Sequence, residues 1–270
     1  MSYKFALVGS NGFISKRHKK AIENIGGELA LTCDIQGEAD FKDWVEMIHS
    51  PRFKEITHVS VCVPNYLHSV MVKELLALNK KVICEKPLTI FNDIYIDDPK
   101  LNVVLQLRHN PIVKKLKEEN FSGNIKIVVK SYRPPEYWNS WKGNSALSGG
   151  ILYNMGIHYL DLLIHLLGEP LTIPYSEYDT KKAIGTIEFQ KGTGEYHIEL
   201  LGEEYKDAPV VRKIAFNGEE MDLEGATIPL NDSGAVLDLH TEVYKDFVAG
   251  KGVRLSEAKR SLDLVKHLCS

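Results

Sequence analysis

The sequence has 270 residues, of which 44% are hydrophobic and 26% are charged, with a formal net charge of −3. These values describe an ordinary globular protein that can bury a substantial core in one large domain or two smaller ones. There is no basic block and no apolar run of membrane-spanning length, so we exclude nucleic acid and membrane as partners. The chain opens on a strand-like segment rather than an apolar secretory signal, and we therefore expect a cytoplasmic protein.

The first third of the sequence alternates apolar strand-like runs with helical patterns. The runs cover residues 3–8, 28–33, 58–63 and 81–84, and helical patterns run through residues 21–22 and over 69–78. This alternation predicts βαβ units around a parallel sheet. Cys33, Cys62 and Cys84 lie in or beside these runs, and the four cysteines lack the paired spacing of a metal site. We expect these three to be buried free thiols, with no bound metal.

A glycine turn joins the first predicted strand to the first helix. Gly9 and Gly12 are two of the glycines expected where a pyrophosphate approaches the N-terminus of a helix, although Asn11 replaces the middle glycine and Ser15 the last small residue. A plain tight turn is the alternative interpretation. The second strand ends at Asp34, where a carboxylate would accept hydrogen bonds from ribose hydroxyls and repel a 2′-phosphate. This spacing favours NAD over NADP.

Two further turns follow the third and fourth predicted strands. They contain Pro64-Asn65 and Glu85-Lys86-Pro87. Open α/β sheets bind ligands at the carboxyl ends of their strands, so both turns are candidates for a cofactor crevice.

The second half of the sequence contains a glycine-rich segment, Gly149 to Asp161, that leads into an apolar helix ending near residue 167. Asn154 and His158 are four residues apart on its opening turn, a spacing that aims both side chains at one spot. The alternative is a buried histidine satisfied by a neighbour. Strands are predicted near residues 183–189, 195–201 and 211–216, and helices near 239–249 and 256–268.

These motifs together resemble the glucose–fructose oxidoreductase/inositol dehydrogenase (Gfo/Idh/MocA) family. The resemblance rests on the order and spacing of Pro64-Asn65 with His68, the Glu85-Lys86-Pro87 turn, and Gly150 to His158. It implies an α/β protein with an N-terminal Rossmann domain over residues 1–109. A C-terminal α/β domain with an open, mostly antiparallel sheet follows over residues 110–270, and its last helices are free to pack back on the first domain.

Further motifs resemble UDP-N-acetylglucosaminuronate 3-dehydrogenases within that family. They include Gly9 to Ile14, Leu105 to His109, Ser140 to Gly143 and Asn217 to Met221. The resemblance implies NAD-dependent oxidation of the C3′ hydroxyl of a UDP-hexuronic acid. The 3-keto product would pass to an aminotransferase in the biosynthesis of surface-glycan sugars. It also implies a homodimer or homotetramer.

The chemistry of such an oxidation needs a base near the hydroxyl and stabilisation of developing alkoxide charge. We expect His158 to be the base, Lys86 the electrostatic partner, and Asn154 an orienting group, because an amide cannot carry a proton through the cycle. By the resemblance, cofactor contacts are expected from Gly9, Asn11, Gly12, Phe13, Ile14, Asp34, Pro64, Asn65, His68, Glu85, Lys86 and Gln106. Substrate contacts are expected from Lys86, Arg108, Arg133, Trp141, Lys142, Asn154 and His158. The alternatives are a loop whose aromatics cap the sheet, for the segment that contains Arg133, Trp141 and Lys142, and a helix start facing solvent, for Arg108.

The sequence also departs from the expected pattern. Only about a dozen residues separate Leu88 from Leu101, too few for a full crossover helix, and Asp97-Asp98-Pro99 is poor helix material. A trimmed fold with an intact set of site residues favours an active enzyme. A dehydrogenase of another sugar or polyol, and a non-catalytic regulator that binds NAD and a sugar, remain alternatives.

Overall fold

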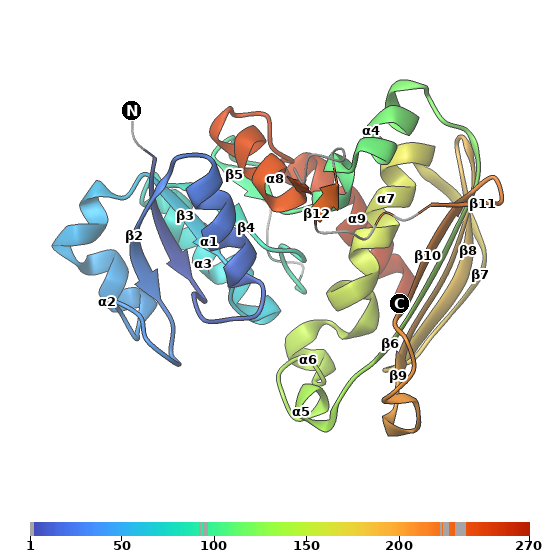
Figure 1. The fold of residues 1–270 in the computed structure, drawn as a ribbon, viewed down its shortest axis with the longest axis horizontal. Helices are drawn as coiled ribbons and strands as arrows, with labels where there is room; N and C mark the ends of the chain where they lie inside the picture. The colour runs from blue at the N-terminus through green and yellow to red at the C-terminus, as the bar shows by residue number, and fades with distance from the viewer. Residues whose placement is uncertain (1–2, 92, 94–96, 222, 224–226, 230–235) are drawn as a thin grey trace. The chain divides into compact units, whose positions relative to one another are not determined.

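The computed structural model describes residues 3–91, 93, 97–221, 223, 227–229 and 236–270 (Figure 1). Within this part of the chain, no helix combines the length and apolar character needed to cross a membrane. The chain divides into two compact units. The first contains residues 1–106 and 226–258, and the second contains residues 107–225 and 259–270. The predicted boundary after residue 109 lies close to this division, and a C-terminal segment returns to the first unit.

The first unit is built on a five-stranded sheet in the order β2-β1-β3-β4-β5, with every neighbouring pair parallel (Figure 1). Its strands are β1 (Lys4–Val8), β2 (Glu28–Cys33), β3 (His58–Val61), β4 (Lys81–Cys84) and β5 (Leu101–Val103). Its helices are α1 (Ser15–Asn24), α2 (Trp44–His49), η1 (Pro51–Glu55), η2 (Asn65–Leu67), α3 (His68–Ala77) and α8 (Leu239–Val248). From β1 to β2 the chain moves across the sheet in one direction, and from β3 to β4 it moves in the other. Right-handed crossovers therefore place α1 on one face of the sheet and α3 on the other. This is the predicted Rossmann fold.

Helix α8 completes the core of the first unit. Phe5 of β1, Ile22 of α1 and Tyr244 of α8 belong to one buried apolar cluster, and each is at most 1% exposed. Burying such side chains stabilises the unit by roughly 1.5–3 kcal/mol each. The short strands β12 (Thr227–Pro229) and β13 (Val236–Asp238) pair antiparallel before α8. A segment late in the sequence therefore supplies one wall of the N-terminal unit.

The connection between β4 and β5 is short. Of residues 85–100, the structure describes all except 92 and 94–96, and the described ones form bends and turns rather than a helix. The part of the expected trimming that falls on residues 92 and 94–96 lies outside the described residues.

The second unit contains a six-stranded sheet in the order β11-β10-β6-β9-β8-β7 (Figure 1). Its strands are β6 (Gly123–Tyr132), β7 (Pro170–Tyr178), β8 (Lys182–Phe189), β9 (Gly192–Leu201), β10 (Val211–Phe216) and β11 (Glu219–Met221). Only the β6–β9 pair is parallel, so the predicted mostly antiparallel sheet is confirmed. Burial alternates along β6 and β9, as expected when one face packs on a core.

Helix α7 (Ile157–Leu167) covers the buried face of this sheet against β6 and β9. Nine of its 11 residues are buried, and Gly168, with a φ of 89°, ends it. The other helices near this unit are η3 (Gln106–His109), α4 (Pro111–Glu118), α5 (Pro135–Trp138), α6 (Ser145–Ser148), η4 (Leu152–Gly156), η5 (Glu203–Tyr205) and α9 (Leu255–Leu268). The apolar run after His158 is thus the central core helix of the second unit.

Candidate active site

The glycine turn after β1 brings the backbone close to a neighbouring strand end. Gly9 has a φ of +80°, and a Cβ there would lie 2.5 Å from the Cys62 carbonyl oxygen after β3. The Gly12 N–H donates to the Gly9 carbonyl oxygen at 3.2 Å. Among the described residues, no side chain caps the N-terminus of α1, whose N-cap is Ile14. The N-terminus of α1 therefore keeps its partial positive charge at this turn, although the Ser15 and Arg17 N–H groups already donate to the Gly12 and Ile14 carbonyl oxygens. An anion at this turn stays a prediction.

Asp34 is tied to the same turn. Its Oδ2 accepts from the Asn11 N–H and its Oδ1 from the Gln36 N–H, both at 2.8 Å. Asn11 also donates from Nδ2 to the carbonyl oxygen of Gln36 at 2.6 Å. Each carboxylate oxygen keeps a further lone pair, so Asp34 remains able to accept ribose hydroxyls. Asn11, in place of the middle glycine, fixes the turn to the loop after β2.

Two large apolar side chains stand exposed beside these groups. Phe13 is 87% exposed and Ile35 is 83% exposed. Exposed apolar side chains next to an anion-binding turn suit contact with the flat rings of a dinucleotide. The sequence prediction included Phe13 but missed Ile35, although its place directly after Asp34 was a usable signal.

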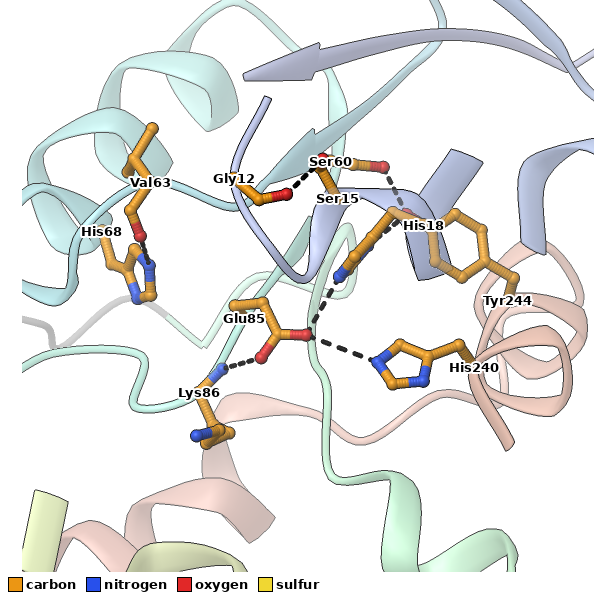
Figure 2. Close-up of polar contacts among 10 residues, drawn as sticks. All are labelled: Gly12, Ser15, His18, Ser60, Val63, His68, Glu85, Lys86, His240 and Tyr244. Carbon is orange, nitrogen blue, oxygen red and sulfur yellow. Dashed lines mark hydrogen bonds and ion pairs between the residues drawn. The ribbon is translucent and has the colours of Figure 1, made fainter. Parts of the chain in front are cut away.

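His68 joins the turns at the ends of β3 and β4. Its Nε2 lies 2.8 Å from the Val63 carbonyl oxygen, a contact drawn in Figure 2. Its Nδ1 lies 2.6 Å from the Pro87 carbonyl oxygen. Burial lowers the pKa of His68, while the two carbonyl oxygens oppose that shift. The buried Asn65 lies in the same turn region. The predicted cofactor residue His68 thus links the turn after β3 to the turn after β4.

Glu85 is the centre of a buried polar network (Figure 2). Its Oε1 lies 2.9 Å from His18 Nε2 and 3.7 Å from His240 Nε2, and its Oε2 accepts from the Lys86 N–H at 3.3 Å. One potential metal-ligating atom from each of Glu85, His18 and His240 lies within 4.8 Å of the others. Burial opposes ionisation, but the two histidines hold the pKa of Glu85 well below its usual range. Neither histidine was among the residues predicted from the sequence.

In the second unit, the glycine-rich segment adopts a less regular form than predicted. Residues Leu152–Gly156 form a π-helical turn before α7 begins at Ile157. Asn154 lies in this π turn and His158 is the second residue of α7, and both are partly buried. Single π turns inside helices occur frequently at functional sites.

Asn154 is joined to the aromatic and cationic segment after β6. Its Nδ2 donates to the Tyr137 hydroxyl at 3.0 Å, and the Arg133 guanidinium lies 5.2 Å from the centre of the Tyr137 ring. Arg133 Nη2 also lies 3.5 Å from Met155 Sδ. Tyr137 was missed as a site residue, although it lies three residues before the motif that begins at Ser140. This contact brings Arg133 and Asn154 into one cluster.

Lys142 adds a second cation to this part of the second unit. Its Nζ lies 5.8 Å from the centre of the Trp141 ring. Burial, and then the charge of Arg133, lower the pKa of Lys142. Two partly buried cations that repel each other would be stabilised by an anionic ligand.

Arg108 has a different environment from these cations. Its Nε and Nη2 donate to the two carboxylate oxygens of Asp161, both at 2.8 Å, and the two side chains are 8% and 2% exposed. The Ser261 hydroxyl donates to the same carboxylate at 3.1 Å. This buried pairing favours a structural role for Arg108 over the predicted contact with substrate, because the guanidinium fork is already engaged. Gln106, predicted to contact cofactor, begins η3 and is partly buried.

The predicted residues therefore fall into two groups, one in each unit. All of the predicted cofactor residues lie in the first unit, and the predicted substrate residues other than Lys86 lie in the second. Two family models match the chain in the same order. "Oxidoreductase family, NAD-binding Rossmann fold" matches residues 3–94, and "Oxidoreductase family, C-terminal alpha/beta domain" matches residues 122–203.

The chain belongs to the Gfo/Idh/MocA oxidoreductase family. The two matches together span more than half of the chain. The residues of the first unit fit NAD, because the Gly9 turn lies tightly against the end of β3 and the Asp34 carboxylate at the end of β2 is hydrogen-bonded to the same turn. Gly9, Gly12, Asp34 and the turn at Pro64 are the residues that would hold it.

Relatives within the family act on several sugars and polyols. The chain is 26% identical to scyllo-inositol 2-dehydrogenase (NADP(+)) IolW of Bacillus subtilis over 58% of this chain and 48% of that protein. It is 30% identical to myo-inositol 2-dehydrogenase of Thermotoga maritima over 49% of this chain and 41% of that protein. The aligned regions thus span less than half the length of either relative.

Solved structures of the family align over nearly the whole chain. The WlbA (WbpB) dehydrogenase from Thermus thermophilus, in complex with NAD and UDP-GlcNAcA, is 27% identical with a TM-score of 0.82, covering 100% of this chain and 95% of that one. The same dehydrogenase in complex with NAD and alpha-ketoglutarate gives a TM-score of 0.79 at 27% identity, covering 99% and 94%.

Proposed function

We propose that the protein uses NAD to oxidise the C3′ hydroxyl of a UDP-hexuronic acid, UDP-N-acetylglucosaminuronic acid, to the 3-keto sugar. The observation that carries this proposal is a cluster of three side chains. The Arg133 guanidinium lies over the Tyr137 ring, and the Tyr137 hydroxyl accepts a hydrogen bond from the Asn154 amide. Asn154 is four residues before His158 in the sequence. Aromatic faces and cations together suit a nucleotide, a pyrophosphate and a sugar carboxylate. The likeness to a dehydrogenase solved with UDP-GlcNAcA supports the same choice.

The reaction assigns a separate task to each residue. His158 accepts the hydroxyl proton, because an imidazole has an intrinsic pKa suited to a base near neutral pH. Lys86 donates a hydrogen bond to the same oxygen and stabilises its developing negative charge. Asn154 orients the hydroxyl through its amide. NAD, when bound, supplies the hydride acceptor.

A coupled assay tests this function directly. Purified protein is mixed with UDP-N-acetylglucosaminuronate and NAD, and absorbance at 340 nm is followed with and without alpha-ketoglutarate. We expect a rise without the keto acid. Loss of the rise with the keto acid would indicate that NADH is reoxidised in place, as the keto-acid complex of the Thermus thermophilus protein suggests. The 3-keto product would then be a substrate for a transaminating enzyme.

The variant His158→Ala separates catalysis from cofactor binding. We expect turnover to fall by about 10²- to 10⁴-fold, the usual contribution of a positioned base. The Kd for NAD should stay within about twofold, because the cofactor residues belong to the other unit. His165→Ala, on the last turn of the same helix α7, is the matched control and should keep its turnover. Full activity in the His158 variant would contradict the proposal.

A second candidate is a dehydrogenase of a free sugar or polyol, favoured by the inositol dehydrogenases among the relatives. It predicts turnover without a UDP moiety and indifference to Arg133→Met and Lys142→Met. Lys126→Met, an exposed cation on β6, controls for loss of charge alone. NAD binding with no turnover of any sugar would instead indicate a regulator.

A further inference from the structure

The side chain of Tyr137 in α5 is held from several sides. Its backbone N–H donates to the Pro134 carbonyl oxygen at 2.9 Å, and its carbonyl oxygen accepts from the Ser140 hydroxyl at 2.7 Å. The Tyr137 ring meets the Trp138 ring edge-on with centroids 5.3 Å apart, and the Arg133 guanidinium lies over it at 5.2 Å. A ring with a cation over its face and an aromatic neighbour has a well-defined position.

The segment that carries Tyr137 is also tied down along its length. At its start, the Arg133 N–H donates to the Leu201 carbonyl oxygen of β9 at 3.1 Å. Further on, Trp138 Nε1 donates back to the Arg133 carbonyl oxygen at 3.2 Å. A Cβ at Gly143 would lie 2.3 Å from the Trp138 carbonyl oxygen, so a glycine is needed where the backbone closes on itself. Tyr137 therefore presents its hydroxyl from a fixed support.

Asn154 receives that hydroxyl on the π-helical turn Leu152–Gly156. Its Nδ2 donates to the Tyr137 hydroxyl at 3.0 Å. The last torsion of an asparagine side chain is broad and roughly two-fold, so the backbone alone does not determine which way the amide turns. A hydrogen bond from one end of the amide removes that freedom. The Tyr137 hydroxyl therefore constrains the direction of the Asn154 amide.

We propose that Tyr137 is a positioning residue, whose hydroxyl holds the amide of Asn154 in the orientation that the oxidation requires. The inference rests on the proposed function, in which Asn154 orients the reacting hydroxyl. Tyr137 itself touches neither the reacting atoms nor the cofactor in this proposal. Because Arg133 lies over the same ring, the cation expected to bind the substrate and the amide expected to orient it share one support.

A purely structural link between Tyr137 and Asn154 makes a different prediction. Such a link would fasten the segment that carries Arg133 and Lys142, so its loss would displace both cations and raise the KM for the UDP-sugar. A positioning role instead acts on the bound substrate, so its loss lowers kcat and leaves KM nearly unchanged. The split between kcat and KM therefore distinguishes the two roles.

Tyr137→Phe keeps the ring and removes only the hydroxyl. We expect kcat to fall roughly 3- to 10-fold, the scale of one lost hydrogen bond, and the KM for the UDP-sugar to change less than about twofold. Tyr132→Phe is the matched control, because it removes another tyrosine hydroxyl of the same unit, hydrogen-bonded to Glu203, and should leave kcat unchanged. A raised KM with an unchanged kcat in Tyr137→Phe would overturn the inference.

A double variant tests whether Tyr137 acts through Asn154. In the Asn154→Ala background, Tyr137→Phe should lower kcat no further, because the amide that Tyr137 holds is gone. If Tyr137→Phe costs the same factor in the Asn154→Ala background as in the wild type, the two residues act independently and the inference is wrong.

A readout independent of turnover separates this inference from the proposed function. In protein labelled with ¹⁵N-asparagine, the side-chain amide signal of Asn154 is identified by its loss in Asn154→Ala. It should shift in Tyr137→Phe and stay in place in Tyr132→Phe, because only the first variant removes the acceptor of Nδ2. If the wild type reduces no NAD with any UDP-sugar, the proposed function fails, while the amide signal still decides whether Tyr137 holds Asn154. An unchanged signal in Tyr137→Phe would overturn the inference.

Discussion

The buried ion pair between Arg108 and Asp161 gives the sharpest test of the second unit. Arg108→Met removes the guanidinium and leaves the Asp161 carboxylate, which is 2% exposed, without its cation. Breaking one side of a buried pair costs about 3–5 kcal/mol. The Ser261 hydroxyl still donates to Asp161 at 3.1 Å and retains about 1 kcal/mol of that interaction. We therefore expect a loss of about 2–4 kcal/mol in the free energy of unfolding.

Urea unfolding followed by circular dichroism measures this loss. With a slope of about 3 kcal/mol per molar urea, the midpoint of the second unit should fall by about 1 M. The double variant Arg108→Met/Asp161→Leu should recover most of it, because apolar replacement of a buried pair is often neutral. The KM for the UDP-sugar should change less than about threefold in the folded single variant. An unchanged urea midpoint together with a large rise in the KM for the UDP-sugar would refute this reasoning and favour a contact between Arg108 and the substrate.

Three other outcomes follow from single positions in the first unit. Gly9→Ala should lower the affinity for NAD by more than tenfold in a fluorescence titration. The new Cβ would lie 2.5 Å from the Cys62 carbonyl oxygen, and the left-handed φ costs a further 1–2 kcal/mol, roughly. Gly26→Ala, with a similar φ and no atom within 4 Å, should have only that conformational cost and should bind NAD as tightly as wild type. Asp34→Ser should shift the ratio of kcat/KM for NAD and NADP toward NADP by at least about tenfold, since the carboxylate no longer repels a 2′-phosphate; an unchanged ratio would remove Asp34 from the ribose site. Burial lowers the pKa of His58 from 6.5 to about 4. Its neutral ring therefore stabilises the fold fully above about pH 6.5, and this contribution of about 1–3 kcal/mol is lost as the pH falls toward 4. In urea titrations at several pH values, His58→Gln should reduce the dependence of the unfolding free energy on pH over this range, and an equal dependence in both proteins would contradict the prediction.

The sequence by itself determined the elements and the order of the motifs. Continuous apolar runs predicted β1, β2 and β4 to within about a residue, because strands of a parallel sheet covered on both faces are apolar along their length. The glycine turn, Asp34 and the Glu85-Lys86-Pro87 turn directly follow β1, β2 and β4, so a parallel sheet necessarily carries them to its carboxyl edge. The family and the use of NAD followed from these local features.

Only the tertiary structure decided which polar groups meet. His18 and Tyr244 are 226 residues apart in the sequence, and Arg108 and Asp161 are 53 residues apart, yet each pair is joined by buried hydrogen bonds. A sequence does not show which acidic residue pairs with a given arginine, so Arg108 seemed as available for a substrate as Arg133. Propensity alone did not assign α8 to the first unit, because its apolar face would fit any core; only the family resemblance allowed the last helices to pack back there. The partners were selected by long-range packing, which places a buried charge only where another element brings its counter-charge.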